Sequence, residues 1–64
     1  MITVKTRKGE EIKIIISSIT HFYAQIDKKE TFTIIHLVNN LEMSVSDSVA
    51  TIEAAILRFM DRHL

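Results

Sequence analysis

The sequence predicts an α+β fold, in which a small antiparallel β-sheet of about five strands precedes one C-terminal amphipathic helix packed on one face. Apolar residues alternate with period two over the first two thirds of the chain, and their spacing changes to three and four near Ser46. The chain has no proline and a single glycine, so nothing marks a linker. Its 64 residues allow one core, and we predict a single domain over residues 1–64.

Two short strands on either side of Gly9 form the first predicted hairpin. Apolar residues alternate with polar ones at Ile2, Val4, Ile12, Ile14 and Ile16. A three-residue loop that ends at Gly9 places Val4 opposite Ile12 and Lys5 opposite Glu11. A two-residue turn would set a charged residue opposite an apolar one. The pattern therefore favours the three-residue loop.

The segment Ile19–Ile26 predicts a third strand, because two serines interrupt the apolar run that precedes it. Alternation places His21 and Tyr23 on one side of this strand and Phe22 on the other. The charged run over residues 27–31 follows directly, and we expect it to be a solvated loop.

A fourth strand is predicted at Phe32–Val38, followed by a two-residue turn at Asn39-Asn40, since asparagine tolerates positive φ. This turn sets the register of a fifth strand that begins at Leu41. His36 then lies on the face that meets the helix, whereas Ile35 and Leu37 lie on the reverse face.

The clearest helix signal begins after residue 45, where Ser46, Asp47 or Ser48 is suited to cap a helix. The apolar stripe at spacings of three and four consists of Val49, Ile52, Ile56, Phe59 and Met60. One helix of this length covers one face of a small sheet and leaves the other face to meet something else.

The face left uncovered predicts an interface, since large exposed apolar patches mark binding surfaces. We expect it to contain Ile15, Ile19, His21, Tyr23, Ile35 and Leu37. Self-association is the simplest use of such a patch, so we predict a homo-oligomer. The helix exterior is a second candidate surface for a protein partner of unknown identity.

No motif in the sequence indicates catalysis. The three histidines lack the spacing of a metal site, and the serines have no nucleophile elbow or phosphate-binding glycine loop around them. We expect His36 to be a core or boundary histidine and His63 a solvated helix end. The expectation is a non-enzymatic regulatory or interaction protein with no catalytic residue, metal or cofactor.

Composition favours a globular domain in the cytoplasm. Apolar residues make up 47% of the sequence, which exceeds the share in disordered chains. No apolar run is long enough to span a membrane, the opening residues do not form a signal peptide, and cysteine is absent. We therefore predict no membrane insertion.

The alternative function is a small nucleic-acid-binding transcriptional regulator. Four basic residues gather on the first hairpin, at Lys5, Arg7, Lys8 and Lys13. Such residues are suited to contact phosphates. Their interleaving with Glu10 and Glu11, and the net charge of zero, favour a solvated surface instead.

Two resemblances extend this interpretation. The run Met43-Ser44-Val45-Ser46-Asp47-Ser48-Val49 before an amphipathic helix, with the opening strand and the Gly9 turn, resembles the FlbD-like (SwrD-like) family of small flagellar proteins. Asn39-Asn40 stands where that family has Asn-Gly. The succession from Thr3-Val4-Lys5 through Ile52-Glu53 is similar to part of the LytTR-type DNA-binding domain. The first resemblance implies a flagellar accessory and the second implies DNA binding; a regulatory subunit and a phage-type inhibitor are equally compatible roles.

Overall fold

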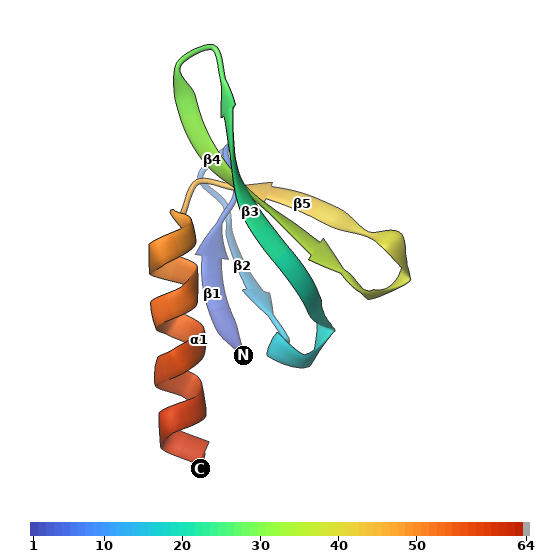
Figure 1. Cartoon of the computed structure of the whole chain (residues 1–64), viewed down its shortest axis with the longest axis vertical. Helices are drawn as coiled ribbons and strands as arrows, with labels where there is room; N and C mark the ends of the chain where they lie inside the picture. The colour runs from blue at the N-terminus through green and yellow to red at the C-terminus, as the bar shows by residue number, and fades with distance from the viewer. Residues whose placement is uncertain (64) are drawn as a thin grey trace.

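The computed structural model describes residues 1–63 of the chain, and the side chains of residues 1–61, and it confirms the predicted α+β fold. Strands β1 (Ile2–Lys5) and β2 (Glu11–Ile14) form one antiparallel sheet. Strands β3 (Ile19–Asp27), β4 (Glu30–Leu37) and β5 (Glu42–Val45) form a second antiparallel sheet, and helix α1 spans Val49–His63. Figure 1 shows α1 beside β1, with the β3–β4 hairpin projecting away from the helix. The expectation for His63 lies outside the described side chains.

The two sheets join at the end of β1. Thr6 forms an isolated antiparallel bridge with Val45. The Ser46 N–H donates a hydrogen bond to the Lys5 carbonyl oxygen at 2.8 Å, and the Lys5 N–H donates to Oδ1 of Asp47 at 2.7 Å. The five strands thus belong to two sheets that continue into each other at this point, instead of to one flat sheet.

The first hairpin has the register that the sequence predicts. Val4 lies opposite Ile12 and Lys5 opposite Glu11. Gly9 has φ +90°, which an L side chain rarely adopts, and its N–H donates to the Thr6 carbonyl oxygen at 2.9 Å. The three-residue loop is therefore confirmed, and Gly9 occupies its left-handed position.

The β3–β4 connection differs from the predicted solvated loop. Asp27 pairs with Glu30, so Lys28 and Lys29 alone form the turn, with φ of +50° and +70°. Two consecutive residues at positive φ are typical of the hairpin turn whose twist matches the flanking strands. Strand β4 therefore begins at Glu30 and not at Phe32.

The predicted register of β4 and β5 is wrong by one residue. The loop contains Val38 as well as Asn39 and Asn40, and the Leu37 N–H donates to the Leu41 carbonyl oxygen at 2.7 Å. Ile35 consequently lies opposite Met43. Both asparagines have positive φ as expected, at 67° and 62°. The additional loop residue nevertheless shifts the register by one, and such a shift moves every side chain of a strand to the other face of the sheet.

The core fills the space between the two sheets and the helix. Its buried members are Ile2, Val4, Ile14, Ile35, Val45 and Ile52. Ile35 and Val45 have no exposed surface, and Ile52 anchors α1 with 1% exposed. Ser48 caps this helix, because its Oγ accepts a hydrogen bond from the Thr51 N–H at 3.1 Å.

Candidate interaction surface

Three aromatic rings stack on the outer face of β3 and β4. His21 lies directly opposite His36, and Tyr23 lies two residues further along β3 on the same face. The ring centroids of His21 and His36 are 4.3 Å apart with an interplanar angle of 15°, and those of Tyr23 and His36 are 5.4 Å apart. We call these three residues the imidazole–tyrosine cluster. Cross-strand pairing therefore assembles a continuous stack from residues that are distant in sequence.

Two oxygen atoms converge on Nε2 of His36. The Tyr23 hydroxyl oxygen lies 3.2 Å from it, and Oε2 of Glu42 lies 3.5 Å from it. Glu42 reaches this position because it pairs with His36 across β4 and β5. Since the His36 side chain is only 25% exposed, these contacts hold its ring in one orientation.

The hydrogen bonds of Thr20 indicate which ring nitrogen of His21 acts as a donor. The Thr20 hydroxyl donates to the His36 carbonyl oxygen at 3.1 Å, and the same Oγ1 lies 3.2 Å from Nδ1 of His21. A hydroxyl has one proton and a carbonyl oxygen only accepts, so Nδ1 of His21 must be the donor to Oγ1. His21 is exposed, so the opposite edge of its ring, which carries Nε2, is accessible to a partner.

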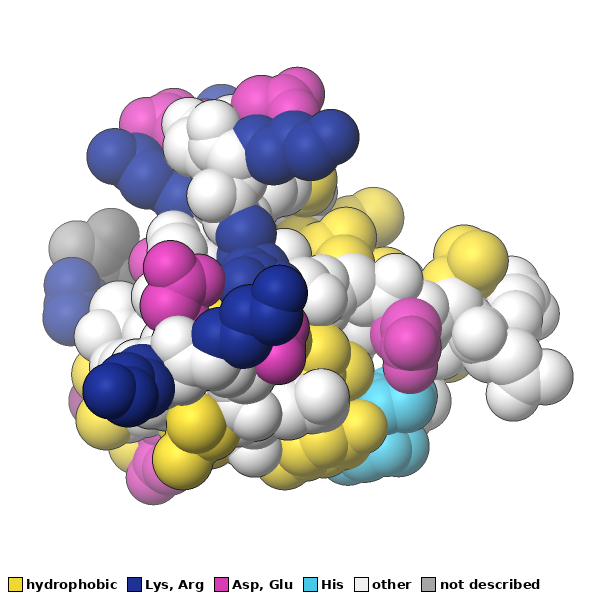
Figure 2. All heavy atoms as spheres, turned by 90° about the horizontal axis from the view of Figure 1, so that it is seen from above, with side chains coloured by type: hydrophobic (Ala, Val, Ile, Leu, Met, Phe, Trp, Pro, Cys, Tyr) yellow, Lys and Arg dark blue, Asp and Glu magenta, His cyan; other side chains and the backbone are white. Residues whose placement is uncertain are grey.

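The cluster has the chemistry of a binding surface. Flat rings with polar edges offer apolar contact and hydrogen bonds together. Within the described part of the chain, no group of three or more histidine, cysteine, aspartate or glutamate residues could hold a metal ion. Figure 2 shows histidine side chains next to hydrophobic ones at one border of the molecule.

The six residues of the predicted interface have different environments. Ile15 and Tyr23 are exposed at 58% and 44% of their surface, and His21 is also exposed. Ile19 and Leu37 are partly buried and pack against the core. Ile35 is fully buried, so its expected place on an exposed face is wrong, and the cause is the one-residue shift between β4 and β5.

His36 belongs to the imidazole–tyrosine cluster, although the sequence predicted it on the opposite face. The sequence placed His36 on the helix-facing side because it assumed a two-residue turn at Asn39-Asn40. A two-residue turn at Lys28 and Lys29 would have paired His21 with His36 directly. Lysine pairs carry no usual turn signal, so a two-residue turn at this position was not predicted.

The basic residues of the first hairpin are partly engaged within the chain. Nη2 of Arg7 lies 2.9 Å from Oε2 of Glu30, and its guanidinium group lies 4.0 Å from the Phe32 ring centroid. Lys5 lies opposite Glu11, and Lys13 lies opposite Thr3. In Figure 2 the Lys and Arg side chains are interspersed with Asp and Glu side chains. Of the four predicted phosphate-binding residues, Arg7 is therefore engaged in an ion pair within the chain.

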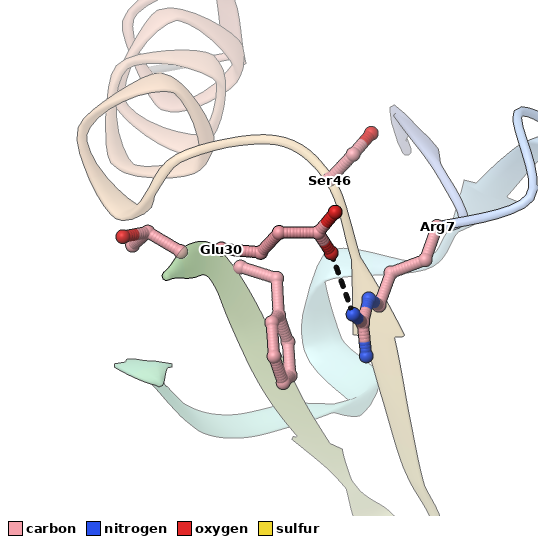
Figure 3. Close-up of a pocket in the computed structure, with 5 residues that line it drawn as sticks. Arg7, Glu30 and Ser46 are labelled. Carbon is pink, nitrogen blue, oxygen red and sulfur yellow. Dashed lines mark hydrogen bonds and ion pairs between the residues drawn. The ribbon is translucent and has the colours of Figure 1, made fainter. Parts of the chain in front are cut away.

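A shallow depression lies where Arg7 approaches the β3–β4 hairpin. Its volume is about 310 Å³, and its lining consists of Arg7, Glu30, Thr31, Phe32 and Ser46. Figure 3 shows Arg7 and Glu30 pointing toward each other across it. The guanidinium group of Arg7 is thus already engaged by the Glu30 carboxylate. This ion pair links the first hairpin to β4.

Comparison with known proteins identifies no relative: no family model, no curated protein and no solved structure matches the chain. Among the described residues, no helix has the length and apolar character that crossing a membrane requires.

Proposed function

We propose that this protein is a non-enzymatic interaction module of the cytoplasm, that it forms a homo-oligomer, and that it acts by binding another protein chain through the surface of β3 and β4. The observation that carries this proposal is the imidazole–tyrosine cluster, in which the exposed rings of His21 and Tyr23 stack with the partly buried ring of His36.

The cluster is suited to binding because it is already ordered. Tyr23 is 44% exposed, yet its hydroxyl contacts His36 and its ring takes part in the stack. An aromatic side chain held in this way loses little conformational freedom on association. Tyrosine is also enriched among the residues that dominate protein interfaces.

Hydroxyl groups at the junction of the two sheets and at the start of α1 have structural uses. Ser48 caps α1, Ser46 donates to the Lys5 carbonyl oxygen, and the Thr33 hydroxyl donates to the carbonyl oxygen of Asp47. The two hydroxyl groups that do contact a histidine ring are those of Thr20 and Tyr23, each 3.2 Å from a ring nitrogen, and the Thr20 hydroxyl donates its proton to the His36 carbonyl oxygen instead. The contacts support the proposal that the protein does not act as an enzyme.

The role of such a module is that of a flagellar accessory, a regulatory subunit or a phage-type inhibitor. Nucleic-acid binding through Lys5, Arg7, Lys8 and Lys13 is the competing function. Because Arg7 already pairs with Glu30, a phosphate that contacts Arg7 would have to displace this carboxylate. The geometry therefore favours a protein partner.

The test is the solution mass by light scattering over a concentration series, at low and high salt, with a mixed-sequence DNA duplex added in a parallel run. We expect an oligomer that is insensitive to salt and does not bind the duplex. A monomer at every concentration would contradict the proposal. Binding to the duplex with a steep salt dependence would replace it with the regulator, because phosphate contacts release counterions.

Two matched variants locate the surface. Tyr23→Ala removes the exposed ring and should weaken self-association roughly tenfold or more, whereas Leu57→Ala removes an apolar side chain of similar exposure from the helix exterior and should not. If Leu57→Ala has the larger effect, the helix exterior is the binding surface.

A further inference from the structure

The free edge of β3 is the longest unprotected edge of the fold. Strand β3 is the outer strand of its sheet, since the strand order is β3-β4-β5. It has nine residues, and every residue from Tyr23 to Asp27 is exposed. Figure 1 shows this part of the β3–β4 hairpin clear of α1. The backbone groups on the outer side of β3 therefore face solvent.

Alternation along the hairpin identifies which groups these are. In a two-residue turn the flanking pair, here Asp27 and Glu30, exchanges backbone hydrogen bonds. Every second residue then points its N–H and C=O toward β4, and the residues between point theirs outward. Phe22, Ala24 and Ile26 accordingly direct their backbone donors and acceptors to the free edge.

This edge lacks the features that usually prevent strand pairing. Natural edges carry charged side chains, proline or a bulge, or are very short. From Ile19 to Ile26 the strand has no lysine, arginine, aspartate, glutamate or proline, and its irregularity lies at its start, between Ile19 and His21. By contrast, β2 is a four-residue strand that carries Glu11 and Lys13.

We propose that a second copy of this chain pairs with the edge of β3, antiparallel and about a twofold axis that passes between the two Ala24 residues. The inference deepens the proposed function, on which it rests, by naming the partner and the element. The two three-stranded sheets then form one six-stranded sheet.

The side chains of β3 favour this register. With Ala24 opposite Ala24 of the second copy, Ile26 faces Phe22 on one side of the sheet, and Asp27 faces His21 on the other. Ile26 is 72% exposed in the single chain, more than any other large apolar side chain among residues 1–61, and the pairing covers it. Shifting the axis to Tyr23 would pair Ile26 with Thr20 and Asp27 with Ile19, so each pair would set a polar side chain opposite an apolar one.

Single-cysteine variants test the register, because the chain has no cysteine of its own. In Ala24→Cys the two Cα atoms of the dimer would be about 5.5 Å apart, within the range of a disulfide. In the matched control Gln25→Cys they would be diagonal neighbours at about 7–8 Å, outside that range. We expect oxidation to link Ala24→Cys into a disulfide dimer and to leave Gln25→Cys unlinked. Equal linking of both variants would overturn the register.

Opposite charges at residue 24 provide a second test. Ala24→Lys and Ala24→Glu each place like charges face to face, so each should weaken self-association roughly tenfold or more. Mixing the two variants should restore the dimer as a heterodimer. An oligomer unaffected by either variant would overturn the edge pairing alone, whereas a wild-type chain that is monomeric throughout would refute the proposed function as well.

Discussion

Substitution of Ile35 tests the observed register of β4 and β5. Ile35 is fully buried, lies between Phe22 and Met43 across the sheet, and belongs to the core cluster. Ile35→Ala removes buried apolar groups and leaves a cavity, so it should lower the free energy of unfolding by about 3 kcal/mol. A chain of this length has about 3–10 kcal/mol in total. The variant should therefore be marginally folded.

The assay is urea unfolding followed by circular dichroism, at one protein concentration for all variants, since association alters apparent stability. In thermal unfolding at the same protein concentration, the melting temperature of Ile35→Ala should fall by about 12–24 °C. The control Leu41→Ala, at a position that is 60% exposed and outside the predicted interface, should change stability by less than about 0.5 kcal/mol. If Ile35→Ala behaves like this control, Ile35 is not in the core and the register with a three-residue loop is refuted.

Two further substitutions test local structure. Ser48→Ala removes the acceptor for the Thr51 N–H and should destabilise the protein by about 1 kcal/mol in the same urea assay, and an unchanged midpoint would contradict the cap. Gly9→Ala adds a Cβ that meets no atom within 4 Å, so its expected loss of about 1 kcal/mol arises from the positive φ alone. Stability equal to that of the wild type would show that the loop relaxes to another conformation.

The sequence predicted those elements whose signals are local. Gly9 fixed the loop of the first hairpin, because one loop length placed apolar against apolar and charge against opposite charge. The stripe through Ile52 likewise predicted the helix, and Ile52 is buried as expected. In both cases several residues of one segment favour the same local geometry.

The remaining elements depended on turns with ambiguous signals. Asn39-Asn40 is compatible with a two-residue or a three-residue loop, and only tertiary packing selects the longer one, which buries Ile35 and Val45 together. Lys28-Lys29 adopts positive φ without glycine or asparagine. These two turns determine which residues meet across the sheet, so the cluster of His21 with His36 could not be found from the sequence.

Amide hydrogen exchange along β3 tests most directly whether this strand is where the protein meets another chain. The N–H groups of Tyr23 and Gln25 point to β4 and should be protected at every protein concentration, whereas those of Ala24 and Ile26 should gain protection as the concentration rises. Rapid exchange of the Ala24 and Ile26 amides in a sample whose mass exceeds that of the monomer would contradict pairing at this edge.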